Sequence, residues 1–255
     1  MLKKRLIFTL LYQEKNFYLS RNFRLQKIGN LDWLKKNYNF SLLTKSVDEI
    51  ILLNVSRNKS LVKDFCKTIY SFSKECFIPI SAGGCITSPE VAKKYIDSGA
   101  DKLVINTELF NSKLIDEVSK LFGEQCIIGS IDFIRNKNIY KFFKNNGLKE
   151  NKLKIAELFK KILSLKIGEL YLNSIDRDGT GNGFDFNILK YIPKDFYKPI
   201  IFVGGAGNYK HLLQAFKKKK IHSIATANLL NFVGDGLQDT RNLISRKGIK
   251  LAEWI

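Results

Sequence analysis

Short apolar runs alternate along this chain with longer stretches in which apolar residues recur at helical spacing. The runs have the length and composition of buried strands. We expect strands at residues 5–10, 49–54, 78–82, 102–106, 126–132, 169–173, 199–203 and 223–226. Strands that alternate with helices build βαβ units, and such units form a parallel sheet. The pattern therefore predicts an α/β fold around a parallel sheet.

Two of the intervening segments carry clear helical signals. Residues 61–76 place apolar side chains on one helical face, and these are Val62, Phe65, Cys66, Ile69 and Phe72. We therefore expect Cys66 to pack against a core rather than to react. The next helix should begin at Ser88 and Pro89, an N-cap followed by a first-turn proline, and end at Ser98 and Gly99.

The chain also contains an internal repeat. The segment PISAGGCITSPEV resembles the later segment PIIFVGGAGNYKH, and their Gly-Gly pairs lie 121 positions apart, close to half the chain. This spacing, with up to one residue of slippage, pairs Gly83–Gly84 with Gly204–Gly205, Glu49 with Glu169, and Leu11 with Asp132. The repeat therefore predicts two related halves of four strands each.

Two such halves close into a (β/α)8 TIM barrel, which commonly occupies this length as one domain, here residues 1–255. The barrel explains the length, the alternation and the repeat together. An open, doubly wound sheet is the alternative, but it would need a nucleotide-binding glycine fingerprint that the sequence lacks.

Composition limits the classes of partner. Lys and Arg outnumber Asp and Glu by 43 to 24, which gives a formal net charge of +19 and an attraction for anions. The lysines are scattered, however, and the densest run, residues 217–220, has no groove-reading motif beside it. We expect a solvated lysine-rich surface and no nucleic-acid partner, and anionic small molecules remain compatible substrates.

The sequence also predicts a soluble, cytoplasmic protein. No apolar run approaches the roughly 20 residues that span a membrane. The N-terminal MLKKRLIFTLLY has no cleavage site and is interpreted as a first strand. The cysteines, Cys66, Cys76, Cys85 and Cys126, form no C-x-x-C pair, and the histidines are His211 and His222. We expect reduced thiols, no metal and no cofactor.

The most polar strand end is the run NSIDRDGTGNGFD at residues 173–185. It follows an apolar strand and turns into a glycine-punctuated loop. Its carboxylates, among them Asp178, are suited to acid/base chemistry, and Gly179 would let backbone N–H groups approach a phosphate. The alternative is a polar turn with an Asp cap.

The Gly-Gly pairs are candidate anion sites, because each follows a strand and precedes a helix N-terminus. Two such sites predict a substrate with a phosphate at each end, whereas tight strand-to-helix packing is the alternative. Asn106 and Thr107 follow the fourth strand as donors near the first site, unless they only cap the next helix. The candidate binding residues are Gly84, Asn106, Thr107, Asp178, Gly179, Gly204, Gly205, Thr226 and Ala227.

Longer motifs give a specific resemblance. The stretches MLKKRLI, VDEIILL, GADKLVINT, FGEQCIIGSID, GELYLNSIDRDGTGNGFD and IIFVGGAG resemble the cyclase subunit of imidazole glycerol phosphate synthase over essentially the whole chain. This family is a (β/α)8 barrel that receives ammonia from a glutaminase docked at the bottom of the barrel. The resemblance implies an ammonia gate of Arg5, Glu49, Lys102 and Glu169, with Asp101 beside the partner interface. A structural salt-bridge cluster is the alternative for these charges.

The departures from the family are equally informative. Leu11 stands where the family has its first catalytic aspartate, whereas Asp132, the second, is retained. Leu19 replaces a substrate-loop lysine, and Asn54 replaces an aspartate. Asp178, Gly179 and Asp185 match in the second half. Leucine cannot exchange a proton, so paired acid/base chemistry is in doubt while Asp132 remains the catalytic candidate.

This combination resembles a divergent branch of the family that forms acetamidino groups on bacterial surface sugars. The leading hypothesis is a synthase- or lyase-type subunit of a glutamine amidotransferase complex, which forms a heterodimer with a glutaminase and uses ammonia on a phosphorylated or sugar substrate beside a separate amidotransferase. The first alternative is the cyclase subunit of histidine biosynthesis. The second is a non-catalytic docking subunit.

Overall fold

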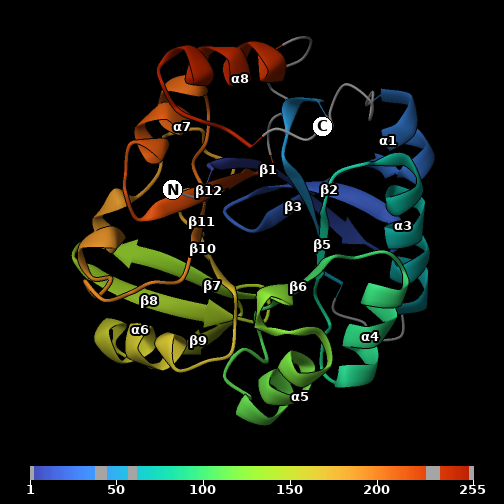
Figure 1. The fold of residues 1–255 in the computed structure, drawn as a ribbon, viewed down its shortest axis with the longest axis horizontal. Coiled ribbons are helices and arrows are strands. Elements are labelled where there is room, and N and C mark those ends of the chain that lie inside the picture. The colour runs from blue at the N-terminus through green and yellow to red at the C-terminus, as the bar shows by residue number, and fades with distance from the viewer. Residues whose placement is uncertain (1–2, 38–44, 57–61, 228–235, 253–255) are drawn as a thin grey trace.

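A closed ring of parallel strands with helices around it forms the centre of the molecule (Figure 1). The computed structural model describes residues 3–37, 45–56, 62–227 and 236–252. The ring runs through β1 (Arg5–Gln13), β4 (Glu49–Asn54), β5 (Ile80–Gly83), β6 (Lys102–Ile105), β7 (Ile127–Asn136), β10 (Glu169–Ser174), β11 (Ile200–Val203) and β12 (Ile221–Thr226), and β12 pairs in parallel with β1. The predicted (β/α)8 TIM barrel is confirmed.

Helices cover the outside of this ring. They are α1 (Leu31–Asn37), α3 (Val62–Glu75), α4 (Pro89–Asp97), α5 (Ser112–Phe122), α6 (Ile155–Leu163), α7 (Tyr209–Phe216) and α8 (Gly236–Arg246), with short 3-10 turns η2 (Glu124–Cys126) and η3 (Phe186–Lys190). Because side chains alternate along a strand, one set packs outward against the helices and the other fills the barrel. The inner set is Ile7, Ile51, Val104, Ile128, Tyr171, Ile201, Val203 and Ala225.

Two antiparallel extensions were not anticipated from the sequence. β2 (Asn16–Arg21) and β3 (Arg24–Asn30) continue β1, and β8 (Ile139–Lys144) and β9 (Lys149–Asn151) continue β7. Each barrel half thus carries one hairpin after its first strand. The β1–β2 turn places Glu14 and Lys15 at positive φ, where glycine or asparagine would have given a turn signal.

Most predicted boundaries agree within a few residues, and the differences have local causes. The helix predicted at 61–76 is α3, whose expected first residue Leu61 lies outside the described residues, and Cys66 packs partly buried against the core. The helix predicted at 88–99 is α4, capped by Ser88 and Ser98 as expected. The strand predicted at 126–132 is longer, because β7 continues beyond the barrel into its hairpin.

The structure also corrects the register of the repeat. Gly84 and Gly204 each follow the last residue of a barrel strand, and both have a φ of 91°. Gly83 corresponds instead to Val203, since both end their strands. Within the described residues, the structure contains no helix that combines the length and apolar character of a membrane span.

Candidate functional site

The carboxyl ends of the barrel strands surround a cavity of about 580 Å³. This end of the barrel carries the reactive groups in enzymes of this fold, because eight strand-end loops converge there. The cavity brings together all the predicted catalytic and binding residues, which are Gly84, Asn106, Thr107, Asp132, Asp178, Gly179, Gly204, Gly205, Thr226 and Ala227.

Asp132 is the central carboxylate of this cavity. It lies on β7, is 7% exposed, and accepts hydrogen bonds from Asn106 Nδ2 at 3.0 Å and from Asn173 Nδ2 at 3.3 Å. Burial raises the pKa of Asp132 to about 7, although the two amide donors oppose the rise. Such a group can gain or lose a proton near neutral pH, which suits acid/base chemistry.

No second carboxylate stands at the end of β1. Leu11 occupies that position and lines the cavity from the side of the ring opposite β7. Asn54 lines the cavity at the end of β4, whereas Leu19 lies on β2 and is not among the lining residues. The geometry therefore agrees with the sequence in offering Asp132 without an acidic partner at Leu11.

The Asp178–Gly179 loop is held against the β2–β3 hairpin. Asp178 Oδ2 accepts hydrogen bonds from the Ser20 hydroxyl and from the Phe23 N–H, the latter at 3.2 Å. A side chain on Gly179 would place its Cβ 2.0 Å from the Ser20 carbonyl oxygen, so only glycine fits. Burial also raises the pKa of Asp178. This loop joins the first hairpin to the second half of the barrel.

Asp185 has a capping role, as the polar-turn alternative anticipated. Its Oδ1 accepts the Asn187 N–H at 3.2 Å at the start of η3 and a hydrogen bond from Arg135 Nη1 at 2.8 Å. Its Oδ2 accepts the Tyr140 hydroxyl at 3.1 Å. Asp185 therefore ties the second hairpin to the barrel.

The strand-end glycines are required by close packing in both halves. A Cβ on Gly84 would lie 1.9 Å from the Asn54 carbonyl oxygen, and one on Gly205 would lie 2.2 Å from the Gly183 carbonyl oxygen. This supports the tight-packing alternative, and it also leaves backbone open to a ligand beside the N-terminus of α7.

Asn106 and Thr107 have partners within the protein. Asn106 Nδ2 donates to the Ser130 carbonyl oxygen at 3.1 Å as well as to Asp132, so both of its amide hydrogens are engaged. Thr107 Oγ1 accepts the Asn145 N–H from the β8–β9 turn at 3.2 Å. Asn106 thus supports the carboxylate of Asp132, and only the Thr107 hydroxyl proton remains as a donor for a ligand.

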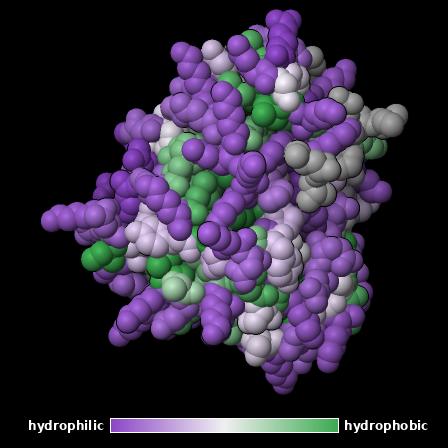
Figure 2. Space-filling view, turned by 60° about the vertical axis from the view of Figure 1, so that its left-hand side comes forward, coloured by the Kyte–Doolittle hydropathy of each residue, from purple (hydrophilic) through white to green (hydrophobic). Residues whose placement is uncertain are grey.

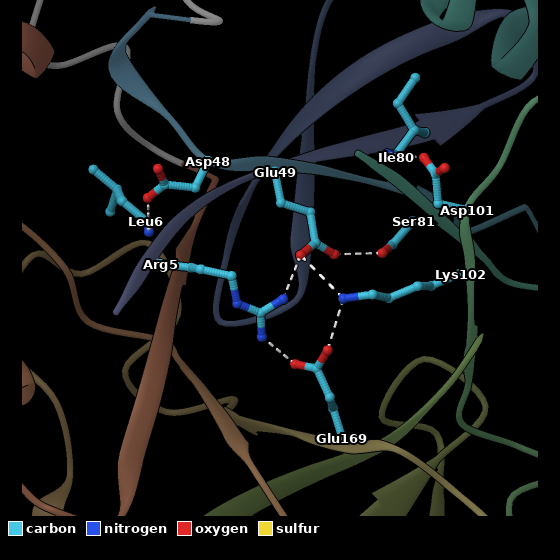
Figure 3. A network of polar contacts seen from close by, with 9 residues as sticks. All are labelled: Arg5, Leu6, Asp48, Glu49, Ile80, Ser81, Asp101, Lys102 and Glu169. Carbon is cyan, nitrogen blue, oxygen red and sulfur yellow. Dashed lines mark hydrogen bonds and ion pairs between the residues drawn. The ribbon is translucent and has the colours of Figure 1, made fainter. Parts of the chain in front are cut away.

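The predicted gate residues form one connected network at the opposite end of the barrel (Figure 3). Arg5 Nη1 lies 2.8 Å from Glu49, and Arg5 Nη2 also contacts Glu169. Lys102 Nζ lies 2.7 Å from Glu169 and 3.4 Å from Glu49, and the Ser81 hydroxyl donates to Glu49. The charges are therefore mutually compensated inside the barrel mouth.

Asp101 beside this ring has a structural partner. Its Oδ2 accepts the Ile80 N–H at 2.8 Å, and Asp48 accepts the Leu6 N–H at 2.7 Å in the same way (Figure 3). Each aspartate directly precedes a barrel strand and clamps the strand before it. Asp101 remains exposed on the rim.

Sequence reasoning assigned no role to three cavity residues, which are Thr9, Tyr171 and Asn173. Asn173 orients Asp132, and Thr9 and Tyr171 lie deeper in the barrel. The alternation of side chains along a strand could have identified two of them. Residues two positions apart point to the same side of the sheet, so Thr9 shares the inner face with Leu11, and Tyr171 shares it with Glu169.

The amino-acid sequence is similar to those of known proteins. Residues 37–233 match the family described as "Histidine biosynthesis protein". The chain is 43% identical over 256 residues to "Putative imidazole glycerol phosphate synthase subunit hisF2" of Parasynechococcus marenigrum (strain WH8102), covering 100% of this chain and 95% of that protein. It is 31% identical over 251 residues to "Imidazole glycerol phosphate synthase subunit HisF" of Pelodictyon phaeoclathratiforme (strain DSM 5477 / BU-1), covering 98% of each.

Proposed function

This chain belongs to the histidine biosynthesis protein family, as a relative of imidazole glycerol phosphate synthase cyclase subunits, and from that premise we propose that it is the ammonia-using subunit of a glutamine amidotransferase complex. One observation carries the proposal: a compensated ring of charges closes one end of the barrel, and a carboxylate that titrates near neutral pH lies at the other. A glutaminase would bind at the ring and supply ammonia.

The interior between these ends is apolar, and in this proposal neutral ammonia crosses it. Its apolar lining includes Ile7, Ile51 and Val104, which would disfavour an ammonium ion but admit ammonia. In this proposal Arg5, Glu49, Lys102 and Glu169 act as the gate, and the exposed Asp101 contacts the partner. Movement of one ion pair in the network would open the entry.

The relatives' names favour the cyclase of histidine biosynthesis over acetamidino-sugar formation, which led the sequence interpretation. We therefore propose a phosphorylated ribulosyl substrate, held between the Gly84 and Gly205 ends of the cavity, with Asp132 as the proton-transfer group. The acetamidino-sugar role remains a second candidate because Leu11 removes the carboxylate with which Asp132 would share acid and base steps. A docking subunit without catalysis is a third.

Genetic complementation separates these proposals. The gene is expressed in a bacterial histidine auxotroph that lacks its cyclase, with its own glutaminase partner co-expressed. Growth without histidine supports the cyclase, provided that the Asp132→Asn variant fails to support it. Absence of growth, in cells where the two subunits co-purify, overturns the cyclase and favours the sugar or docking role.

A further inference from the structure

The floor of the cavity contains polar atoms that the carboxylate chemistry does not use. Thr9 and Asn173 are both buried; Asn173 Oδ1 accepts no hydrogen bond from the described residues, and the Tyr171 hydroxyl is the group that approaches Thr9 Oγ1. A buried polar atom without a partner destabilises the folded protein. Both oxygens line the cavity and have unused capacity to accept a hydrogen bond from a small ligand.

The orientation of the Asn173 amide is fixed by Asp132. The two residues are register partners on β10 and β7, and Asn173 Nδ2 donates to Asp132 Oδ1 at 3.3 Å. When Asp132 is ionised its oxygens accept only donors, so the amide nitrogen faces it and the amide oxygen faces away. Asn173 Oδ1 is therefore an acceptor that needs an N–H or O–H donor.

The phenol of Tyr171 completes this group. It precedes Asn173 by two residues on β10, so both side chains point into the barrel. The ring is 2% exposed among the apolar interior residues, and its hydroxyl faces Thr9 and lies within the field of Asp132. Burial raises the pKa of Tyr171, so the phenol stays protonated at neutral pH while its oxygen can still accept a hydrogen bond.

We propose that Thr9, Tyr171 and Asn173 form a holding site for ammonia beside Asp132, an inference that rests on the proposed ammonia-using function. Ammonia has three N–H donors, and the three side chains offer three neutral acceptor oxygens. The lone pair is then left unengaged for attack on the substrate in the cavity above. An ammonium ion would carry a fourth N–H, which the adjacent carboxylate of Asp132 is placed to remove.

Nuclear magnetic resonance tests the site without requiring turnover. The protein is labelled with ¹³C at tyrosine Cζ, and Tyr171→Phe identifies the Tyr171 signal by its loss. Ammonium chloride at alkaline pH should shift this signal saturably, whereas potassium chloride should not. Thr9→Val, which removes one acceptor, should weaken the apparent affinity about tenfold, since a factor of ten corresponds to about 1.4 kcal/mol and one hydrogen bond contributes about that much. Tyr70→Phe, on the outer helix α3, is the matched control and should leave the response unchanged.

Kinetics with added ammonium then separates this proposal from the function on which it rests. Thr9→Val should raise KM for ammonium about tenfold while kcat and affinity for the bisphosphate substrate stay near wild type. A saturable shift of Tyr171 without turnover of the ribulosyl phosphate would overturn the cyclase function and leave the holding site standing. Turnover without such a shift, and with unchanged KM in Thr9→Val, would overturn the holding site.

Discussion

The Asp132 carboxyl group stands between its two protonation states near neutral pH, because burial opposes the negative charge more strongly than the amides of Asn106 and Asn173 favour it. Activity that needs the carboxylate should therefore fall as pH decreases through about 7. We expect Asp132→Asn to reduce ammonia-dependent turnover by roughly 10²–10⁴-fold, as for loss of a proton-transfer group. Steady-state rates at saturating ammonium measure the effect, and full activity in this variant would exclude a catalytic role.

The same variant should change stability in the opposite direction. The folded protein binds the Asp132 proton more tightly than the unfolded chain does, so the stability linked to this group is present below pH of about 4 and is lost as pH rises through about 7. Asparagine does not ionise, and we expect Asp132→Asn to stabilise the protein at pH 8 by roughly 1–3 kcal/mol, given about 1.4 kcal/mol per unit of pKa shift. Urea unfolding at pH 8 and pH 4 tests this. An equal stability difference at both pH values would contradict it.

A substitution at Leu11 offers a gain-of-function test. Leu11→Asp places a second carboxylate across the cavity from Asp132, which should raise the Asp132 pKa further through like-charge repulsion. If the site keeps the geometry for cyclase chemistry, ammonia-dependent turnover should increase. Leu11→Asn, which adds polarity without charge, is the matched control. Equal rates in the two variants would show that the second carboxylate adds nothing.

At the level of the elements, the charged ring joins the first residues of β1, β4, β6 and β10. Although burial acts to raise the pKa of Glu169, the charges of Arg5 and Lys102 hold it below its usual range. The group therefore stabilises the fold above its unfolded pKa, and this stability is lost as pH falls through the folded value. We expect Glu169→Gln to destabilise the protein by about 3 kcal/mol, since Arg5 and Lys102 must then share the single carboxylate of Glu49.

An exposed ion pair on an outer helix supplies the control for the ring. Lys93 and Asp97 lie 2.8 Å apart on α4, with both side chains more than half exposed. Lys93→Met should cost less than about 1 kcal/mol. Chemical denaturation of both variants at pH 7 measures the contrast, and equal losses would show that the ring contributes no more than a surface pair.

Gly205, in the loop after β11, can be compared with Gly248, which follows α8 and has a similar positive φ. Gly205 has a φ of 106° and no room for a Cβ, whereas Gly248 has a φ of 80° and nothing within 4 Å of a Cβ. Gly248→Ala should cost about 1 kcal/mol from backbone strain alone. Gly205→Ala should cost more and should abolish binding of a bisphosphate at the N-terminus of α7. Calorimetric titration tests the binding, and unchanged affinity in Gly205→Ala would remove this loop from the anion site.

The barrel elements were predictable because each combines a buried apolar run with a helix at regular spacing. The pattern located all eight ring strands, and Ser88 and Pro89 located the start of α4. The hairpins were missed because β2 and β3 alternate weakly and turn through Asn22 and Phe23 at positive φ without glycine. The first hairpin is held in place by contacts between residues that are distant in sequence, such as the hydrogen bond from the Phe23 N–H to Asp178.

The candidate site was predictable where a motif carried it, and not where packing created it. Asp132 and the Asp178–Gly179 loop stood out as polar residues at the ends of apolar strands. Tyr171 did not, because a tyrosine within an apolar strand usually belongs to the core, and only the closed barrel brings its hydroxyl toward Thr9. Asn106 was assigned to a ligand, but the fold directs its amide to Asp132.

The molecule as a whole carries a net charge of +19, and hydrophilic residues dominate the face shown in Figure 2. A partner that binds this chain tightly is expected to be acidic where it meets the rim, because complementary charge accelerates association. We predict that the association rate with the glutaminase falls about tenfold or more when NaCl rises from about 50 to about 500 mM, as screening shortens the range of attraction. Stopped-flow mixing measures the rate, and a rate independent of salt would indicate an apolar interface.

The seam between β1 and β12 has a consequence for how the chain reaches its native state. Arg5 pairs with Ser223, and a further bridge joins Lys4 to Leu251. Closing the ring therefore needs almost the entire polypeptide, and the entropy of forming such a long loop makes this step late and slow. During synthesis β1 would wait with an open edge until the last strand leaves the ribosome. A circularly permuted chain that began at β12 would turn the same pairing into a local contact and would move the late, long-range closure to the pairing of β11 with β12.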